Sequence, residues 1–172
     1  MPLYAVHLRT HGEEKYIQIA DRTLQDTGIK FFWLRRALKL RRKGKWINNI
    51  APIFPGYIFL ESMEVSSYLY YKLKGIPGFY QFLKSDHNIT PLCRNDREIL
   101  NHFLTFGEIV DKSIVVFDEN NRIKVVSGPL IGLDGLIVKV DRRKGRAKVR
   151  LDLYNKSILI DFGFEALERM VE

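Results

Sequence analysis

The hydrophobic pattern of this chain of 172 residues changes near Gly107, and this change constrains the fold more than any other feature. Before Gly107, segments that alternate with a period of two are interspersed with segments that repeat at helical spacing. After it, short runs rich in Val, Ile and Leu follow one another between turn residues, without a long amphipathic helix. The first pattern predicts helices packed on a sheet, and the second predicts a small barrel of strands. We therefore expect two domains.

The first domain is predicted to span residues 1–107 as an α+β sandwich with a mostly antiparallel sheet, in the order β-α-β-β-α-β-α. Its strands are expected at residues 3–8, 30–34, 57–62 and 79–83. One helix is expected at residues 65–74, and two others follow capping-box spacings, Thr10 with Glu13 and Asn95 with Glu98. In a capping box, a side-chain oxygen and a carboxylate satisfy the amides at the start of a helix.

The second domain is predicted to be a small all-β barrel of residues 122–172, joined to the first by a linker or turn at residues 108–121. Its strands are expected at residues 122–126, 135–140, 147–154 and 156–162. A barrel of roughly 50 residues is close to the lower size limit for a self-sufficient core. Because Val, Ile and Leu alternate strongly, we expect residues ~120–172 to remain β-structured when expressed alone.

The positive charge of the chain is concentrated in two places. The formal net charge is +8, and half of the 28 cations lie in the segments Arg35–Lys45 and Lys139–Arg150. Such dense basic segments predict a polyanionic partner, with nucleic acid ahead of an anionic membrane surface. The alternative is that each is a solvated loop that keeps the protein soluble.

The second basic segment is predicted to be an exposed two-stranded ribbon that contacts a folded RNA. The cations assigned to this contact are Arg142, Arg143, Lys144, Arg146, Lys148 and Arg150. Strand alternation points the last three outward, because the residues that separate and follow them suit a core face: Ala147, Val149 and Leu151. The first three occupy the turn, where their side chains are free to reach the RNA.

Several classes of protein are not expected from this sequence. Cys93 is the only cysteine, so no internal disulfide can form, which fits a reducing cytosol. No apolar run approaches the roughly 20 residues that span a bilayer, and the N-terminus lacks the pattern of a signal peptide. We find no metal-ligand spacing, nucleophile with a neighbouring base, or glycine-rich phosphate loop. We therefore expect a cytoplasmic, monomeric binding protein without catalytic residues or a cofactor.

The stretch "APIFPGYIFLE" combines a rigid entry with a strand of large apolar residues. Pro52 and Pro55 fix the backbone, and Gly56 permits a tight bend before the strand. The aromatic side chains that this arrangement can present are Phe54, Tyr57 and Phe59. Alternation places the last two on one face, so one face can pack on helices while the other remains a partner surface. The alternative is that all three rings belong to the core.

Two stretches resemble a known family. "PIFPGYIFL" is similar to the signature strand of the NusG N-terminal domain, and "VVSGPLIGLDGLIVKVDRRKGRAKVRL" resembles the KOW motif of the NusG C-terminal domain. Both occur in the family order and spacing, and the resemblance covers nearly the whole chain. It implies an N-terminal polymerase-binding domain at residues 1–107 and a KOW barrel at residues 122–172. It also implies a transcription processivity factor that binds bacterial RNA polymerase.

The resemblance also implies roles for individual residues. The aromatic strand would dock on the clamp helices of the polymerase through Tyr4, Phe54, Pro55, Tyr57 and Phe59. The facing gate loop would contact Ser66, Ser67 and Tyr68, for which a polar helix start is the alternative. The first basic segment would be a variable loop near the upstream DNA fork, attracting phosphates through Lys39, Arg41, Arg42 and Lys43. Weaker candidates for the non-template strand are Lys15 and His11, the latter with a capping-turn alternative.

The sequence departs from general NusG proteins in the KOW turn. Leu130 stands where those proteins have an aromatic residue that contacts termination factor Rho and a small-subunit ribosomal protein. This loss, together with the basic ribbon, resembles specialised paralogues such as LoaP. It implies an antitermination factor that binds polymerase and a nascent RNA element. The alternatives are a general elongation and pausing factor and a structural ribosome-associated KOW protein. RfaH, another specialised relative, has a barrel that can refold as helices, but we expect a permanent barrel here.

Overall fold

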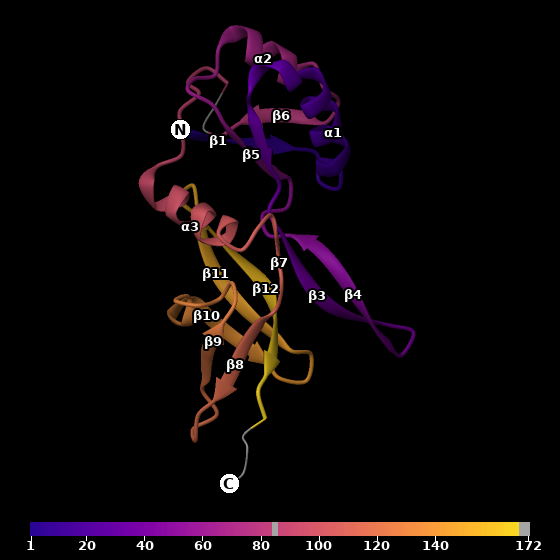
Figure 1. Ribbon diagram of the computed structural model, residues 1–172, viewed down its shortest axis with the longest axis vertical. Helices are drawn as coiled ribbons and strands as arrows, with labels where there is room; N and C mark the ends of the chain where they lie inside the picture. The colour runs from indigo at the N-terminus through magenta and orange to yellow at the C-terminus, as the bar shows by residue number, and fades with distance from the viewer. Residues whose placement is uncertain (84–85, 169–172) are drawn as a thin grey trace. The chain divides into compact units, whose positions relative to one another are not determined.

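The computed structural model describes residues 1–83 and 86–168, and its chain forms two compact units (Figure 1). The first unit combines Met1–Leu34 with Phe54–Ile99. The second combines Arg35–Ile53 with the chain from Leu100 onward. Each unit is described by itself below.

The first unit is a four-stranded sheet in the order β2-β5-β1-β6, in which every neighbouring pair is antiparallel. Its strands are β1 (Leu3–Leu8), β2 (Lys30–Phe32), β5 (Tyr57–Glu61) and β6 (Phe79–Phe82). Its helices are α1 (Glu13–Thr23), the 3-10 turn η1 (Gln25–Thr27) and α2 (Ser67–Lys74), and α3 (Arg94–Leu104) begins in this unit. Ile58 and Leu60 of β5 share one core with Tyr16 of α1 and with Leu69 and Leu73 of α2. This face of the sheet therefore packs on the helices.

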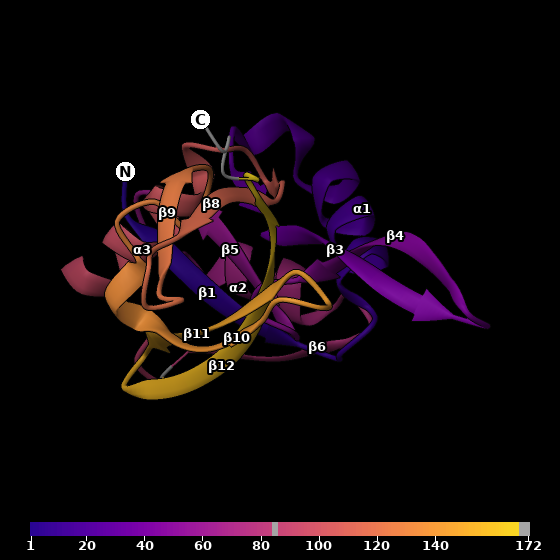
Figure 2. The same ribbon diagram turned by 90° about the horizontal axis from the view of Figure 1, so that it is seen from below.

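The second unit contains a five-stranded sheet in the order β10-β11-β12-β8-β9. The strands are β8 (Ser113–Phe117), β9 (Ile123–Ser127), β10 (Ile137–Asp141), β11 (Arg146–Leu153) and β12 (Lys156–Ala166), with the 3-10 turn η2 (Asp134–Leu136) before β10. Figure 2 shows β10, β11 and β12 side by side, in agreement with their antiparallel registers. Strand β8 pairs in parallel with β12 and antiparallel with β9, so it links the two halves of the sheet.

The first basic segment is not a loop, because it forms most of a β-hairpin that the sequence did not predict. Strands β3 (Arg35–Arg42) and β4 (Lys45–Pro52) pair antiparallel, and β7 (Ile109–Val110) completes a three-stranded sheet. The tight turn between β3 and β4 places Lys43 and Gly44 in the left-handed region, with φ values of 48° and 77°. Strand β3 could not be recognised from the sequence, because its few apolar side chains are scattered among cations.

Most elements agree with the sequence predictions, and the α+β fold class is confirmed. The clearest difference is at residues 108–121, expected as a linker, which contain β7 and β8. Both capping boxes were wrong. Helix α1 has Gly12 as its N-cap without a side-chain hydrogen bond, and α3 already begins at Arg94. Glu13 bonds elsewhere, as described below.

No helix in the described part of the chain has the length and apolar character needed to cross a membrane.

Candidate nucleic-acid interface and aromatic strand

The turn between β10 and β11 presents the second basic segment. Asp141 pairs with Arg146 at the base of the hairpin, and the Asp141 carboxylate accepts a hydrogen bond from the Lys144 amide at 3.0 Å. This contact fixes the turn, because a short acidic side chain replaces a backbone acceptor. Ala147, Val149 and Leu151 of β11 are fully buried, whereas Arg150 is exposed and Arg146 and Lys148 are half-buried. The predicted alternation along this strand is confirmed.

Two cations of this segment are already held by other residues of the second unit. The Arg142 guanidinium lies 3.9 Å from the centre of the Phe117 ring and donates a hydrogen bond to Asn121 Oδ1 at 3.2 Å. The prediction that residues 142–144 are all free to reach therefore fails at Arg142. The Arg146 guanidinium donates to the Lys39 carbonyl oxygen at 2.7 Å, and only 19% of its side chain is exposed.

The other cations of the turn and ribbon are accessible. Arg143, Lys144 and Arg150 are exposed, and in residues 1–83 and 86–168 none of the three forms an ion pair. Lys148 lies beside them on the outward face of β11. A set of exposed cations on one rigid hairpin suits phosphate contacts, since the backbone fixes the spacing of the charges.

In the first basic segment, Arg36 has a structural role and Arg35 is half-buried, whereas the other cations are exposed. Arg36 donates to the carbonyl oxygen of Asp161 at 2.5 Å and to that of Pro52. Burial lowers the pKa of Arg36 to about 10, against the opposing attraction of the Asp161 carboxylate. The cations predicted to meet DNA all lie on the hairpin, and all four are exposed: Lys39, Arg41, Arg42 and Lys43.

The aromatic strand of the first unit presents fewer rings than predicted. Tyr4, Phe54 and Phe59 are at most 5% exposed, and the Phe54 and Phe59 rings meet edge to face at 5.7 Å. Burial raises the pKa of Tyr4, with a smaller contribution from the charge of Glu64. The alternative that the rings belong to the core therefore describes Phe54 and Phe59, but not Tyr57.

Tyr57 instead takes part in a partly exposed row of rings across three strands. The half-buried Tyr57 ring stacks on His7 of β1 at 4.8 Å, and Tyr80 of β6 meets His7 edge-on at 5.2 Å. Burial raises the pKa of Tyr57, while Tyr80 is 56% exposed. The sequence alone did not assign Tyr80 or His7 to a site. These residues come together because β5, β1 and β6 are neighbours in the sheet, and the sequence alone does not give this order.

The bend before β5 is held by a buried carboxylate. Gly56 has φ of +80°, and a Cβ there would lie 3.2 Å from the Leu8 carbonyl oxygen. The Gly56 amide donates to Glu13 Oε1 at 2.8 Å in a buried contact, and Glu13 is only 2% exposed. A residue expected to cap α1 thus fixes the strand entry that orients Tyr57. Pro55, at this bend, is exposed.

The remaining predicted contact residues lie on the surface of the first unit. Ser66 is the N-cap of α2 and accepts a hydrogen bond from the Leu69 amide at 3.2 Å, which confirms the polar helix start. Ser67 and Tyr68 are exposed at the start of this helix. Lys15 on α1 is exposed, and so is His11, whose φ of 68° places it in a left-handed turn. Their contacts with polymerase or DNA stay predictions.

Leu130, at which the sequence departs from general NusG proteins, is buried in the turn after Gly128. Leu130 is fully buried, and its amide donates to Ser113 Oγ at 2.9 Å. Gly128 has φ of +97°, and a Cβ there would lie 2.7 Å from the Ser113 Cα, so this position requires glycine. Position 130 therefore contributes to the core of the second unit and offers no ring to a partner.

Comparison with known proteins gives one consistent result. The family model described as "Transcription termination factor nusG" matches residues 1–101, which is more than half of the chain. The chain belongs to the NusG family.

Curated relatives agree with this assignment, and a solved structure shares the fold. The chain is 25% identical to the transcription termination/antitermination protein NusG of Thermus thermophilus, over 94% of each protein. It is 28% identical to NusG of Borreliella burgdorferi, over 75% of this chain and 74% of that protein. The solved structure titled "Domain interaction in Thermotoga maritima NusG" covers 94% of this chain and 93% of its own, with a TM-score of 0.57 and 20% identity. That likeness supports the fold.

Proposed function

We propose that this protein is a specialised antitermination factor that binds RNA polymerase through its first unit and a nascent RNA element through the basic turn of its second unit. The observation that carries the proposal is the β10–β11 turn, where accessible cations lie beside a strand, β11, whose inward-facing side chains are fully buried. Structured RNA is recognised through its phosphates and shape, and its unpaired bases can stack on guanidinium planes. The ribbon offers both kinds of contact.

The buried Leu130 favours this proposal over a general elongation factor. General family members are expected to use an aromatic residue at this position to contact Rho and the ribosome. A fully buried leucine has no exposed ring for such a contact. A cheap test is co-purification of tagged protein with polymerase, followed by sequencing of the RNA that it retains. Enrichment of one leader RNA supports a specialised factor, and uniform recovery of all transcripts supports the general one.

The polymerase-binding surface is proposed to be the row formed by Tyr57, His7 and Tyr80. Replacing Tyr57 and Tyr80 together by Ala is expected to weaken polymerase binding by about 30-fold or more. A well-packed interfacial aromatic is typically worth ~2 kcal/mol or more on truncation. The measurement is the recovery of polymerase on immobilised protein across a concentration series.

A matched control is Tyr71→Ala, because Tyr71 is 67% exposed on α2 of the same unit and lies outside the row. Both proteins should keep their circular dichroism spectra, since the replaced rings are not in the core. Equal recovery of polymerase by wild type and the folded double variant would remove the row from the interface. Phe54→Ala is a poor probe, because loss of a buried ring destabilises the unit itself.

A further inference from the structure

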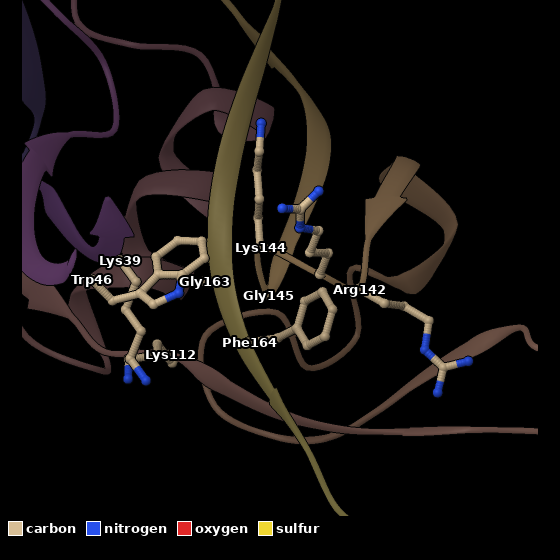
Figure 3. A pocket seen from close by; sticks show the side chains of 9 residues that line it. Lys39, Trp46, Lys112, Arg142, Lys144, Gly145, Gly163 and Phe164 are labelled. Carbon is tan, nitrogen blue, oxygen red and sulfur yellow. The ribbon is translucent and has the colours of Figure 1, made fainter. Parts of the chain in front are cut away.

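The second unit contains a cationic cavity of about 270 Å³ between the β3–β4 hairpin and the β10–β11 turn. Five of the nine described residues that line it are lysine or arginine, and none of the nine is acidic. Two aromatic residues also line it, Trp46 from β4 and Phe164 from β12. Figure 3 shows Trp46 beside Lys39, with Lys144 extending from the turn. The cavity therefore combines positive charge with an aromatic wall.

The walls of the cavity are fixed by a close approach of β12 to β3. A Cβ at Gly163 would lie 3.0 Å from the Ala37 carbonyl oxygen and 2.8 Å from Lys112 Cγ, so glycine favours this close approach of the two strands. The hairpin is also bonded to the sheet, because Arg36 donates to the Asp161 carbonyl and Arg146 donates to the Lys39 carbonyl. These contacts hold Trp46 at a set position relative to the basic turn.

The cations around the cavity divide into held and available ones. Lys112 is paired with Glu165 at 3.0 Å, and the Arg142 guanidinium is stacked on Phe117 and points away from Trp46 in Figure 3. Arg143 and Lys144 are accessible and form no ion pair within the described part of the chain. Together with the exposed Lys39, they leave three charges for an anionic ligand.

The aromatic wall suggests which anion fits. Trp46 is 45% exposed, although contact of a large apolar indole with water is unfavourable. Bases of single-stranded nucleic acid stack on such rings, and nearby cations hold the flanking phosphates. A cavity of about 270 Å³ falls just below the roughly 300–1,000 Å³ of drug-sized pockets, so it suits one base rather than a larger ligand.

We propose that this cavity receives one unpaired nucleotide of RNA, with its base stacked on Trp46 and its flanking phosphates held by Lys39, Arg143 and Lys144. This inference rests on the proposed function, because it assigns a loop nucleotide of the RNA element to a defined place beside the basic turn. The β3–β4 hairpin and the β10–β11 turn would then bind the same nucleotide.

The test follows the emission of Trp46 in the full chain carrying Trp33→Phe, which removes the only other tryptophan. The probes are a single-stranded RNA hexamer of mixed sequence and an abasic hexamer with the same backbone charge. The RNA hexamer should quench Trp46 to saturation, and the abasic hexamer should not. Trp46→Ala lacks the fluorophore, so its binding is measured by the anisotropy of a labelled hexamer. It should bind the RNA hexamer about 5- to 150-fold more weakly, the range for one base stacked on a ring. Trp46→Phe should recover part of that affinity.

One control and three contradicting outcomes decide the result. Ile50→Ala, at a 52% exposed position of the same strand outside the cavity, should bind both hexamers like wild type. An unchanged Trp46 emission at saturation, or equal RNA affinity of Trp46→Ala and wild type, would overturn the pocket. Equal weakening of both hexamers by Trp46→Ala would also overturn it, since that pattern indicates a structural role. Failure of the proposed function has a different signature, which is equal affinity for the target RNA hairpin and a scrambled hairpin.

Discussion

A fragment of residues 120–172 is expected to lack a cooperative thermal transition, whereas a fragment of residues 108–172 should unfold cooperatively with a β-type circular dichroism spectrum. The shorter fragment lacks β8, which is the only partner of β9 in the five-stranded sheet of the described chain and also pairs with β12. It also lacks the fully buried Val115 and the hydroxyl of Ser113 that accepts from the Leu130 amide.

The expected magnitude follows from the small size of this core. Burial of one valine is worth about 1.5–3 kcal/mol, and an orphaned buried amide costs about 1–3 kcal/mol. A core of this size rarely supplies more than about 3–5 kcal/mol in total. The destabilisation therefore matches the whole stability of the fragment. Because β8 pairs with β9 and β12, we now expect that residues ~120–172 do not suffice for a stable barrel, in contrast to the expectation from the sequence.

The matched control keeps residues 108–172 but replaces residues 113–117 by a Gly/Ser stretch of equal length. It should behave like the shorter fragment, because its length is restored without the strand. A sigmoidal melt of residues 120–172 at the same temperature as the longer fragment would contradict the assigned role of β8. Substantial helical content in residues 108–172 would instead indicate a fold-switching relative of the RfaH type.

The second large effect is expected from removing the four outward-facing cations of the basic ribbon, Arg143, Lys144, Lys148 and Arg150, by substitution with Gln. Removal of each charge that binds a phosphate should lower the salt slope of RNA binding by about 0.7 to 0.9. The electrostatic part of binding vanishes near 1 M salt, so removal of all four charges weakens binding roughly 200- to 900-fold at about 0.15 M. The measurement is the affinity of the full chain for a hairpin RNA across a salt series.

A control variant removes the same number of charges elsewhere, by substitution of Arg22, Lys30, Lys72 and Lys74, which are exposed on the first unit. If net charge alone drove binding, both variants would bind RNA equally weakly, and the ribbon would have no special role. Replacing Arg143 and Arg150 by Lys keeps the charge but removes the planar fork. It should retain the salt slope and relax the preference among RNAs if these arginines stack on or fork to bases.

The orientation of side chains could be predicted from the sequence where one face of a strand is buried and the other is not. The alternation of β11 follows directly from a period of two, and the apolar residues at Ala147, Val149 and Leu151 leave one orientation only. The bend at Gly56 was likewise predictable, because few residues tolerate its backbone conformation. In such places local chemistry and tertiary burial agree.

The sequence was insufficient where tertiary contacts override the local pattern. Glu13 has the spacing of a helix cap, but its carboxylate is drawn to the Gly56 amide of a distant turn. The hairpin of β3 and β4 carries so many cations that its few buried side chains, such as Leu38, do not stand out. Trp46 and the basic turn line the same cavity because β12 lies close to β3. Local sequence patterns could not predict this tertiary contact.

The most direct test of the central claim is the affinity of the full chain for the hairpin RNA recovered with it and for a scrambled hairpin of the same length and composition, at two salt concentrations. The proposed function predicts that both affinities fall with salt while a clear preference for the recovered hairpin persists at physiological salt. Equal affinity for the two hairpins at physiological salt would contradict specific RNA recognition and leave only general attraction to polyanions.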